Sequence, residues 1–547
     1  MILRCFVFYR PRHFPLFHTA VFGYNRRNVY RRNGIFAIIM IMNRSSGILL
    51  PVFSLPSPGG IGCFSREAHH FIDRLSEAGQ KYWQILPLGP AGGWNSPYQP
   101  LSCFAGDPIY IDPYTLAAKG LLNKDELPQD PPKPSDHVDY GRVIPERETL
   151  LRKAFTRFRP GKKYKEFCAD NAWWLEDYAM YMAIRKAAGN SAYQTWTIPF
   201  RRRHPDALSS FAVSHAKELD YIRWTQFEFF TEWNDILDYA HKNGVQIIGD
   251  IPIYVSADSS DCWAHPEMFQ FDRHLKPKAV AGCPPDGFNP EGQHWGNPLY
   301  DWKKLEADAY SWWKQRLRQN FRMYDLIRID HTRGFQSYYS IPADAKTAAE
   351  GHWRKGPGIH FFEEIEKEFG PGRFIAEDLG HITPAVRKMV KESGLPGMKV
   401  LQFAFDGDPH NPYLPTNFDR HCVVYTGTHD NNTTRGWYTS LGNDTKKQIT
   451  AYIRAQMGCH PIQSVKAPIF GASQAAVSLT EVALHCIADL CIIPMQDHLL
   501  LGSEARVNTP GTVGSFNWSW RMVPDAFTPE LAEYIGQLTS DSGRWPK

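Results

Sequence analysis

From about residue 47 onward, the chain alternates short apolar runs with longer amphipathic stretches. In the stretch 65–79, Ala68, Phe71 and Leu75 follow the spacing of one face of an α-helix, and Gly79 is a typical stop signal. We therefore expect strands at the apolar runs and helices between them. The eight runs are 48–53, 82–88, 245–255, 325–334, 373–379, 398–405, 422–430 and 490–497.

Eight strand-like runs separated by helices predict an α/β fold of the (β/α)8 type, the TIM barrel, rather than an open doubly wound sheet. No glycine-rich dinucleotide fingerprint or phosphate-binding loop competes with this interpretation. A helix is expected over 302–324, directly before the run 325–334. Thr383 and Pro384 together predict the start of another helix.

Two long interruptions predict insertions into the barrel. Residues from about 89 to 223, between the second and third runs, are rich in Pro, Asp, Lys and aromatic residues without a strand rhythm, so we expect an inserted subdomain there. Residues from about 256 to 300 are expected to form an active-site loop. The catalytic barrel with its insertions would then occupy residues 44–547.

Residues 1–43 differ from the rest of the chain, because they contain seven arginines but no lysine and no acidic residue. This composition is typical of an organelle transit segment, or of an upstream stretch preceding a true start at Met40 or Met42. We favour the second interpretation. The apolar patch 35–42 is too short to span a bilayer.

Composition argues against several classes of function. The formal net charge of +4 over 547 residues gives no basic footprint for nucleic acid or a membrane surface. Ten cysteines occur without paired spacing, which predicts neither a zinc site nor a disulfide framework and favours the cytoplasm. We expect no cofactor and no metal. His331 and His429 are possible metal ligands, but the typical His spacings are missing.

Carboxylates follow most of the predicted strands, and the carboxyl ends of barrel strands share one face. These acids are Asp250, Asp330, Glu377, Asp378, Asp430 and Asp497. Any one of them could be a structural charge; charges directly after apolar runs on several strands indicate a pocket. A site rich in carboxylates suits glycosyl transfer through an oxocarbenium-like transition state. Arg328, two residues before Asp330 on a strand, should share its face.

The chain resembles the 4-α-glucanotransferases, or amylomaltases, from about residue 45 to 521. The ordered motifs that carry the resemblance are 46–50 (SGILL), 83–90 (WQILPLGP), 95–99 (NSPYQ), 249–255 (GDIPIYV), 295–300 (WGNPLY), 328–331 (RIDH), 376–380 (AEDLG), 428–431 (THDN) and 502–506 (GSEAR). The resemblance implies that Asp330 is the nucleophile, Glu377 the general acid and base, and Asp430 the third catalytic carboxylate. It also implies a set of substrate-binding residues: Tyr98, Asp250, Trp295, Arg328, His429 and Asn431.

The resemblance further implies transfer of α-1,4-glucan segments between maltodextrins by a retaining mechanism, with the two catalytic carboxyl groups about 5–5.5 Å apart. The alternative on the same site is an α-1,4-glucan hydrolase, and a binding protein without activity is a third hypothesis. Loops around 286–288 and Trp295 would exclude water from the cleft. The segment 93–95 and Gly287 depart from the family pattern. The resemblance therefore does not imply which residues contact the glucan away from the bond that is cleaved, or the ratio of transfer to hydrolysis. We expect a monomer or homodimer.

Overall fold

The computed structural model describes residues 29–32, 35–38, 43–128, 135–285, 290–457 and 471–546. Most of the predicted extension 1–43, both of its candidate start residues and the predicted loop tip 286–288 lie outside these ranges. Within the extension, β1 (Val29–Arg32) and β2 (Ile35–Ile38) pair as antiparallel strands.

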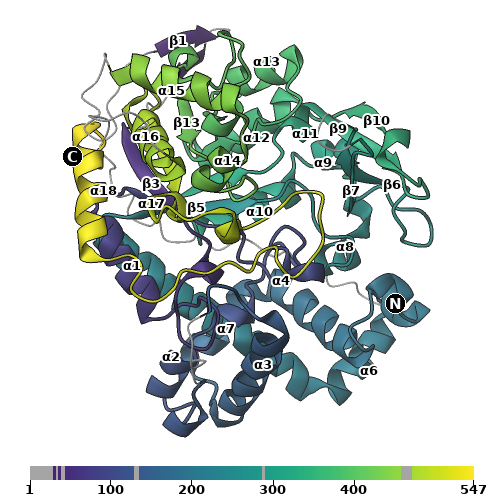
Figure 1. The fold of residues 1–547 in the computed structure, drawn as a ribbon. Coiled ribbons are helices and arrows are strands. Elements are labelled where there is room, and N and C mark those ends of the chain that lie inside the picture. The colour runs from purple at the N-terminus through teal and green to yellow at the C-terminus, as the bar shows by residue number, and fades with distance from the viewer. Residues whose placement is uncertain are drawn as a thin grey trace.

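A closed barrel of eight parallel strands forms the centre of the molecule and confirms the predicted fold class (Figure 1). In order around the barrel, the strands are β3 (Ser45–Leu49), β4 (Tyr82–Gln84), β5 (Gln246–Ile251), β8 (Leu326–Ile329), β11 (Phe374–Ala376), β12 (Gly397–Val400), β13 (Cys422–Tyr425) and β14 (Leu490–Pro494). Each overlaps one of the eight apolar runs, although β3 begins three residues before its run and shares only two residues with it. The runs are longer than the strands because several continue into the loops at the carboxyl ends.

Helices surround the barrel in the usual alternation. They include α1 (Arg66–Glu77), α7 (Ala216–Lys242), α10 (Ser311–Phe321), α12 (Ile359–Phe369), α13 (Pro384–Ser393), α14 (Thr434–Ser440), α15 (Asn443–Met457), α16 (Ala472–His485) and α18 (Pro529–Asp541). The predicted start of α13 is confirmed, since the Thr383 side chain accepts a hydrogen bond from the backbone N–H of Val386.

The single helix expected over 302–324 was a wrong prediction. The segment forms α9 (Trp302–Ala307) and α10, separated by Ala309 and Tyr310. Both of these residues adopt left-handed backbone angles, with φ of 54° and 57°. A right-handed helix cannot continue through such residues, so the apolar periodicity persists across the break while the helix does not.

Between β4 and β5 the described residues form helices only: α2 (Pro113–Ala118), α3 (Tyr140–Arg157), α4 (Lys162–Ala187), α5 (Ile198–Arg201), α6 (Pro205–Ser214) and finally α7, with short 3-10 turns. Most of them lie together below the barrel in Figure 1. The last of them, α7, leads directly into β5, so it also serves as a barrel helix.

The stretch 256–300, expected as a loop, contains α8 (Ser260–Ala264) and two strands, β6 (Ala279–Cys283) and β7 (Gln293–Pro298). With β9 (Ser337–Pro342) and β10 (His352–Lys355) they form a four-stranded antiparallel sheet in the order β10-β9-β6-β7. The short helices α11 (Arg333–Gln336) and α17 (Met495–His498) follow β8 and β14. No described helix is long and apolar enough to cross a membrane.

Candidate active site

Asp250, Arg328 and Asp330 meet at the carboxyl ends of β5 and β8, where Asp250 and Arg328 are partners in the strand register. Arg328 Nη1 lies 2.6 Å from Asp250 Oδ2 and 3.0 Å from Asp330 Oδ1. The expectation that Arg328 and Asp330 share a face is therefore confirmed. One buried guanidinium thus contacts two carboxylates.

The Asp250 side chain is fully buried and has two donors. Its Oδ2 accepts hydrogen bonds from Arg328 and from the Tyr98 hydroxyl, the latter at 2.8 Å. The other oxygen, Oδ1, is buried without a partner among the described residues. A buried carboxylate oxygen without a hydrogen-bond donor costs free energy. The hydrogen-bonding capacity of Asp250 is therefore incompletely used without a ligand.

Glu377 follows β11 and is held by two backbone donors. The N–H of His331 donates to its Oε2 at 2.7 Å, and the N–H of Leu379 donates to its Oε1 at 2.8 Å. His331 has a left-handed backbone, with φ of 51°, unusual for a residue with a side chain. The segment after β8 therefore helps to orient the carboxylate that follows β11.

The charge state of the site is governed by burial. Burial raises the pKa of Asp330 well above its usual range, Arg328 opposes this, and the carboxylates of Asp250 and Glu377 reinforce it. Burial also raises the pKa of Glu377, against the effects of Arg328 and of its backbone donors. The Asp330 side chain is still 28% exposed, so water limits the effect there. The two groups together retain a proton more readily than carboxyl groups in water.

Asp430 follows β13 and is more open than the other acids, with 43% of its side chain exposed. Its Oδ1 accepts a hydrogen bond from Asn508 Nδ2 at 2.6 Å, and its backbone carbonyl accepts one from Arg506 Nη2 at 2.6 Å. Both donors come from the segment after α17, which runs past the barrel towards the helical insertion in Figure 1.

An aromatic group stands beside these carboxylates. The rings of Tyr98 and His429 stack with centroids 5.3 Å apart, and the tyrosine hydroxyl lies 2.9 Å from His429 Nε2. Trp518 packs against the Tyr98 ring at 5.6 Å. Burial lowers the pKa of His429, so its imidazole is neutral at neutral pH. The resemblance implied that Tyr98 binds substrate; its hydroxyl also connects Asp250 to His429.

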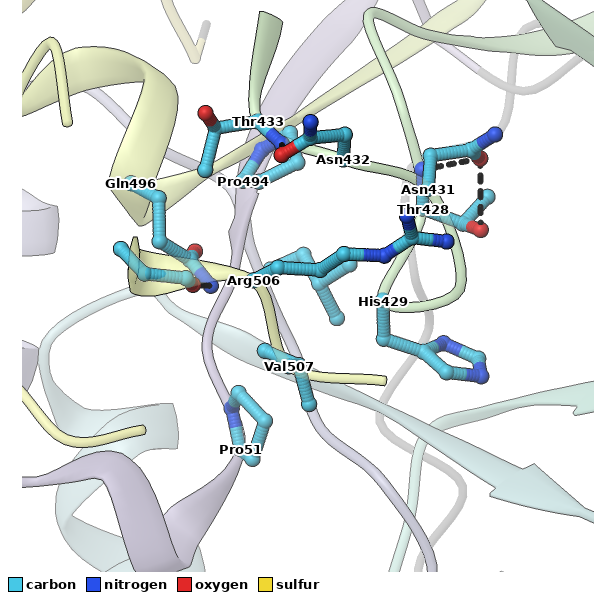
Figure 2. A pocket seen from close by; sticks show the side chains of 12 residues that line it. Pro51, Thr428, His429, Asn431, Asn432, Thr433, Pro494, Gln496, Arg506 and Val507 are labelled. Carbon is cyan, nitrogen blue, oxygen red and sulfur yellow. Dashed lines mark hydrogen bonds between the residues drawn. The ribbon is translucent and has the colours of Figure 1, made fainter. Parts of the chain in front are cut away.

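Thr428, His429 and Asn431 line a cavity together with residues of the segment after α17 (Figure 2). Arg506 extends across it towards Thr428 and Asn431. The Asn431 side-chain oxygen accepts from the N–H and the hydroxyl of Thr428, both at 2.9 Å, which closes the turn. The predicted substrate-binding residue Asn431 therefore also shapes the backbone beside Asp430.

Trp295 lies on β7 of the small antiparallel sheet, and its ring meets the His331 ring edge to face at 4.8 Å. This contact brings Trp295, which the resemblance implied to be a substrate-binding residue, next to the segment that contacts Glu377. Burial lowers the pKa of His331 to about 3, so this imidazole is neutral as well.

Two of the strand-end acids serve the framework. Asp497 is buried and accepts from the Thr426 hydroxyl and from the hydroxyl and N–H of Thr434. Asp378 accepts from the backbone N–H of Met398 at 2.7 Å. Within the described ranges, no group of three or more His, Cys, Asp or Glu residues is arranged to hold a metal ion.

Sequence reasoning missed Asn508, Arg506 as a contact of Asp430, and Trp518. None of them lies at the end of a barrel strand, so the strand pattern could not identify them. The motif 502–506 was the only signal near them. Their contacts to Asp430 and Tyr98 depend on how the segment after α17 folds back over the barrel.

Comparisons with known proteins agree with the barrel fold. The family model for 4-alpha-glucanotransferase matches residues 50–526. The chain is 43% identical over 499 residues to 4-alpha-glucanotransferase from Thermus thermophilus, covering 90% of this chain and 97% of that protein. It is 41% identical over 498 residues to the Clostridium butyricum enzyme of the same name, covering 90% and 99%.

Among solved structures, amylomaltase from Streptococcus agalactiae in complex with acarbose matches with a TM-score of 0.86 and 35% identity. The match covers 92% of this chain and 100% of that structure. Because the family model spans most of the chain and relatives above 40% identity are covered almost completely, the chain belongs to the 4-alpha-glucanotransferase family.

Proposed function

We propose that Asp330, Glu377 and Asp430 carry out the transfer of α-1,4-glucan segments between maltodextrins, which is the activity of this family. The observation that supports the assignment best is the ion pair between Arg328 and Asp330. It favours negative charge on Asp330, whereas the ion pairs of Arg328 do not include Glu377, whose pKa is raised by burial. One carboxylate and one carboxylic acid are what a retaining glycosyl transfer requires.

In the first step, Asp330 attacks the anomeric carbon of the donor glucose and forms a covalent glucosyl ester. The bond from that carbon to the bridging oxygen breaks, and Glu377 gives its proton to this oxygen. In the second step, Glu377 takes the proton from the 4-hydroxyl of an acceptor glucan. That oxygen then attacks the anomeric carbon and releases Asp330, so configuration is retained over the two steps.

The remaining polar groups bind the sugar in the donor subsite. Asp430 keeps Oδ2 for sugar hydroxyls, because Asn508 contacts its Oδ1. Tyr98 and His429 offer stacked rings, and the unpaired Oδ1 of Asp250 can accept from a hydroxyl. The turn that Asn431 closes leaves the amide nitrogen of that residue for a sugar oxygen.

Transfer rather than hydrolysis requires the acceptor sugar to exclude water from the intermediate. Trp295 stands beside His331 on the acceptor side, where its ring can cover a glucose unit. The expected separation of about 5–5.5 Å between the catalytic carboxyl groups stays a prediction. The oligomeric state and a cytoplasmic location stay predictions as well.

Incubation of the purified chain with maltotriose tests the function. Each transfer breaks one glycosidic bond and forms another, so glucose and oligomers longer than maltotriose should appear while the number of reducing ends stays constant. A steady rise in reducing ends without longer products would instead identify a hydrolase. Unchanged maltotriose would contradict both activities.

The pH dependence tests the charge assignment. Activity should fall at acid pH as Asp330 becomes protonated, and at alkaline pH as Glu377 loses its proton. Because burial raises the pKa of both groups, both limbs of the kcat/KM profile should lie above the values of free carboxyl groups. A profile that is flat from pH 4 to 9 would argue against the two roles.

A further inference from the structure

We propose that Met398, on β12, is a positioning residue for the transfer reaction, because its sulfur holds the guanidinium of Arg328 in place beside Asp330. The inference rests on the role that the proposed function gives to Asp330. The Nε–H of Arg328 donates to the Sδ of Met398 at 3.4 Å. A thioether neither gives nor takes a proton in the reaction, so an effect of Met398 on the chemistry passes through Arg328.

The contact lies inside the barrel. In the strand order β11 stands between β8 and β12, so the two residues are not neighbours in the sheet and their side chains meet across the interior. The interior of such a barrel is filled by layers of side chains from alternate strands, which brings β8 and β12 together. Both side chains are buried, with 4% of Arg328 and 1% of Met398 exposed.

Two nitrogens fix the orientation of the guanidinium. Nη1 of Arg328 lies 2.6 Å from Asp250 Oδ2 and 3.0 Å from Asp330 Oδ1. On Nε, the sulfur of Met398 accepts. Because a guanidinium is planar and its donors point in fixed directions, a group held at both nitrogens cannot turn without loss of a contact. Met398 therefore keeps the plane of the cation where Nη1 contacts both carboxylates.

A thioether suits this position because it is a weak and uncharged acceptor. A carboxylate in its place would compete with Asp330 for the cation. A hydrocarbon would leave a buried N–H of a charged group without an acceptor, which costs free energy. The sulfur accepts from Nε while the positive charge of Arg328 stays directed at the two carboxylates.

The backbone of Met398 contacts the segment of the other catalytic acid. Its N–H donates to Asp378 Oδ1 at 2.7 Å, and Asp378 directly follows Glu377. The preceding residue, Gly397, packs so closely on this carboxyl group that a Cβ atom would stand 2.6 Å from one of its oxygens. A change of the Met398 side chain leaves the backbone contact in place, so it tests the sulfur separately.

The acid limb of the kcat/KM profile is the readout, because it follows the protonation of Asp330. The charged side chains that act on this carboxyl group come from β5, β8 and the segments after β11 and β13. They are Asp250, Arg328, Glu377 and Asp430. The three acids raise the pKa of Asp330 and Arg328 lowers it, so a loosened Arg328 raises this pKa further. Without the sulfur, the acid limb should therefore move to higher pH by about one unit.

Variants of the full-length chain, assayed with maltotriose, test the proposal. Met398→Leu and Met398→Ile remove the acceptor but keep an apolar side chain of similar volume, so both should shift the acid limb and lower kcat/KM about tenfold on its acid side. The melting temperature should change little, because such exchanges cost less than about 1.5 kcal/mol. Met398→Gln offers an amide oxygen at nearly the same chain length, so its limb should return towards that of the unmodified chain.

Met389→Leu is the matched control. Met389 is also buried, at 4% exposed, but lies on α13, so the acid limb should not move. An unshifted limb in both Met398→Leu and Met398→Ile would overturn the proposal. An equal shift in Met398→Gln or in Met389→Leu would also overturn it, because the effect would then not depend on an acceptor at this position. Failure of the proposed function would appear differently, as missing transfer by the unmodified chain.

Discussion

At the carboxyl ends of the barrel strands two carboxylates, Asp250 and Asp330, contact Arg328, whereas at the amino ends two arginines donate to backbone carbonyl groups. Arg544 is fully buried and donates to the carbonyls of Leu484, Ser45 and Ala488, at 2.6, 2.8 and 2.9 Å. Arg44 donates to Leu484 as well, and to Cys486 at 2.7 Å.

The arginines at the amino end perform a structural task. The carbonyls that they bind include those at the end of α16, which have no partner within the helix, and those that precede β14. A positive charge at a helix carboxyl terminus also interacts favourably with the helix dipole. Since Arg44 precedes β3 and Arg544 follows α18, the two residues join the beginning and the end of the barrel.

At the carboxyl ends of the strands, in contrast, the charged side chains are not all fully hydrogen-bonded. Asp250 keeps an unpaired buried oxygen, and burial raises the pKa of Asp330 and Glu377. Groups whose interactions are incomplete in the free protein can complete them with the substrate or the transition state. Under the proposed function, one barrel uses buried charge for stability at one end and for chemistry at the other.

The largest effect is expected for Asp330→Asn, which changes the catalytic end. Without the nucleophile, kcat should fall by at least about 1,000-fold in the maltotriose assay. The melting temperature should stay the same or rise, because the change removes one of several crowded carboxylates. Strong residual transfer, or marked loss of stability, would contradict the functional role of this charge.

A change at the opposite end should have the reverse consequence. Arg544→Met removes a fully buried donor group that several carbonyls share, so the free energy of unfolding should fall by about 2–4 kcal/mol, measured by denaturant unfolding. The kcat of the folded fraction should change little.

Arg420→Met is the matched control at the amino end. The Arg420 side chain is 66% exposed although it pairs with Asp489 at 2.8 Å. The Asp489 side chain is only 4% exposed and burial raises its pKa, so it can take up a proton when the cation is lost, and the replacement should cost less than Arg544→Met. Equal destabilisation by the two variants would show that burial of the arginine is not what matters.

A smaller loss of activity is expected for Asn508→Asp. This variant adds a carboxyl group at the carboxyl ends of the strands, next to Asp430. The new carboxyl group would contact Asp430, and two carboxylates in contact hold a proton to higher pH than either does alone. The acid limb of the kcat/KM profile should therefore move to higher pH, with about a tenfold loss at neutral pH and partial recovery at alkaline pH.

Asn517→Asp controls for damage to the segment that carries Asn508. Asn517 binds Thr509 and Thr512 within that segment. This variant should lower stability without moving the acid limb. If both variants shift the pH profile equally, Asn508 acts through the fold of the segment rather than through Asp430.

The barrel was predictable because its parallel strands are buried on both faces and therefore appear as continuous apolar runs. Glu377 and Asp430 follow such runs, so their common location could be inferred from strand order. The sheet of β6, β7, β9 and β10 was missed, because its strands come from segments separated in sequence and lack a strong apolar pattern. The break at Tyr310 depends on a local backbone conformation that apolar spacing does not encode.

The sequence by itself determined the number of barrel strands, the face on which the acids gather and the resemblance that implies their roles. Only the tertiary structure decided which acids share Arg328, and that Asp497 belongs to the framework. It also decided that Asn508 reaches Asp430. Periodicity and strand order follow from local chain geometry, whereas these pairings depend on segments distant in sequence packing to within hydrogen-bonding distance.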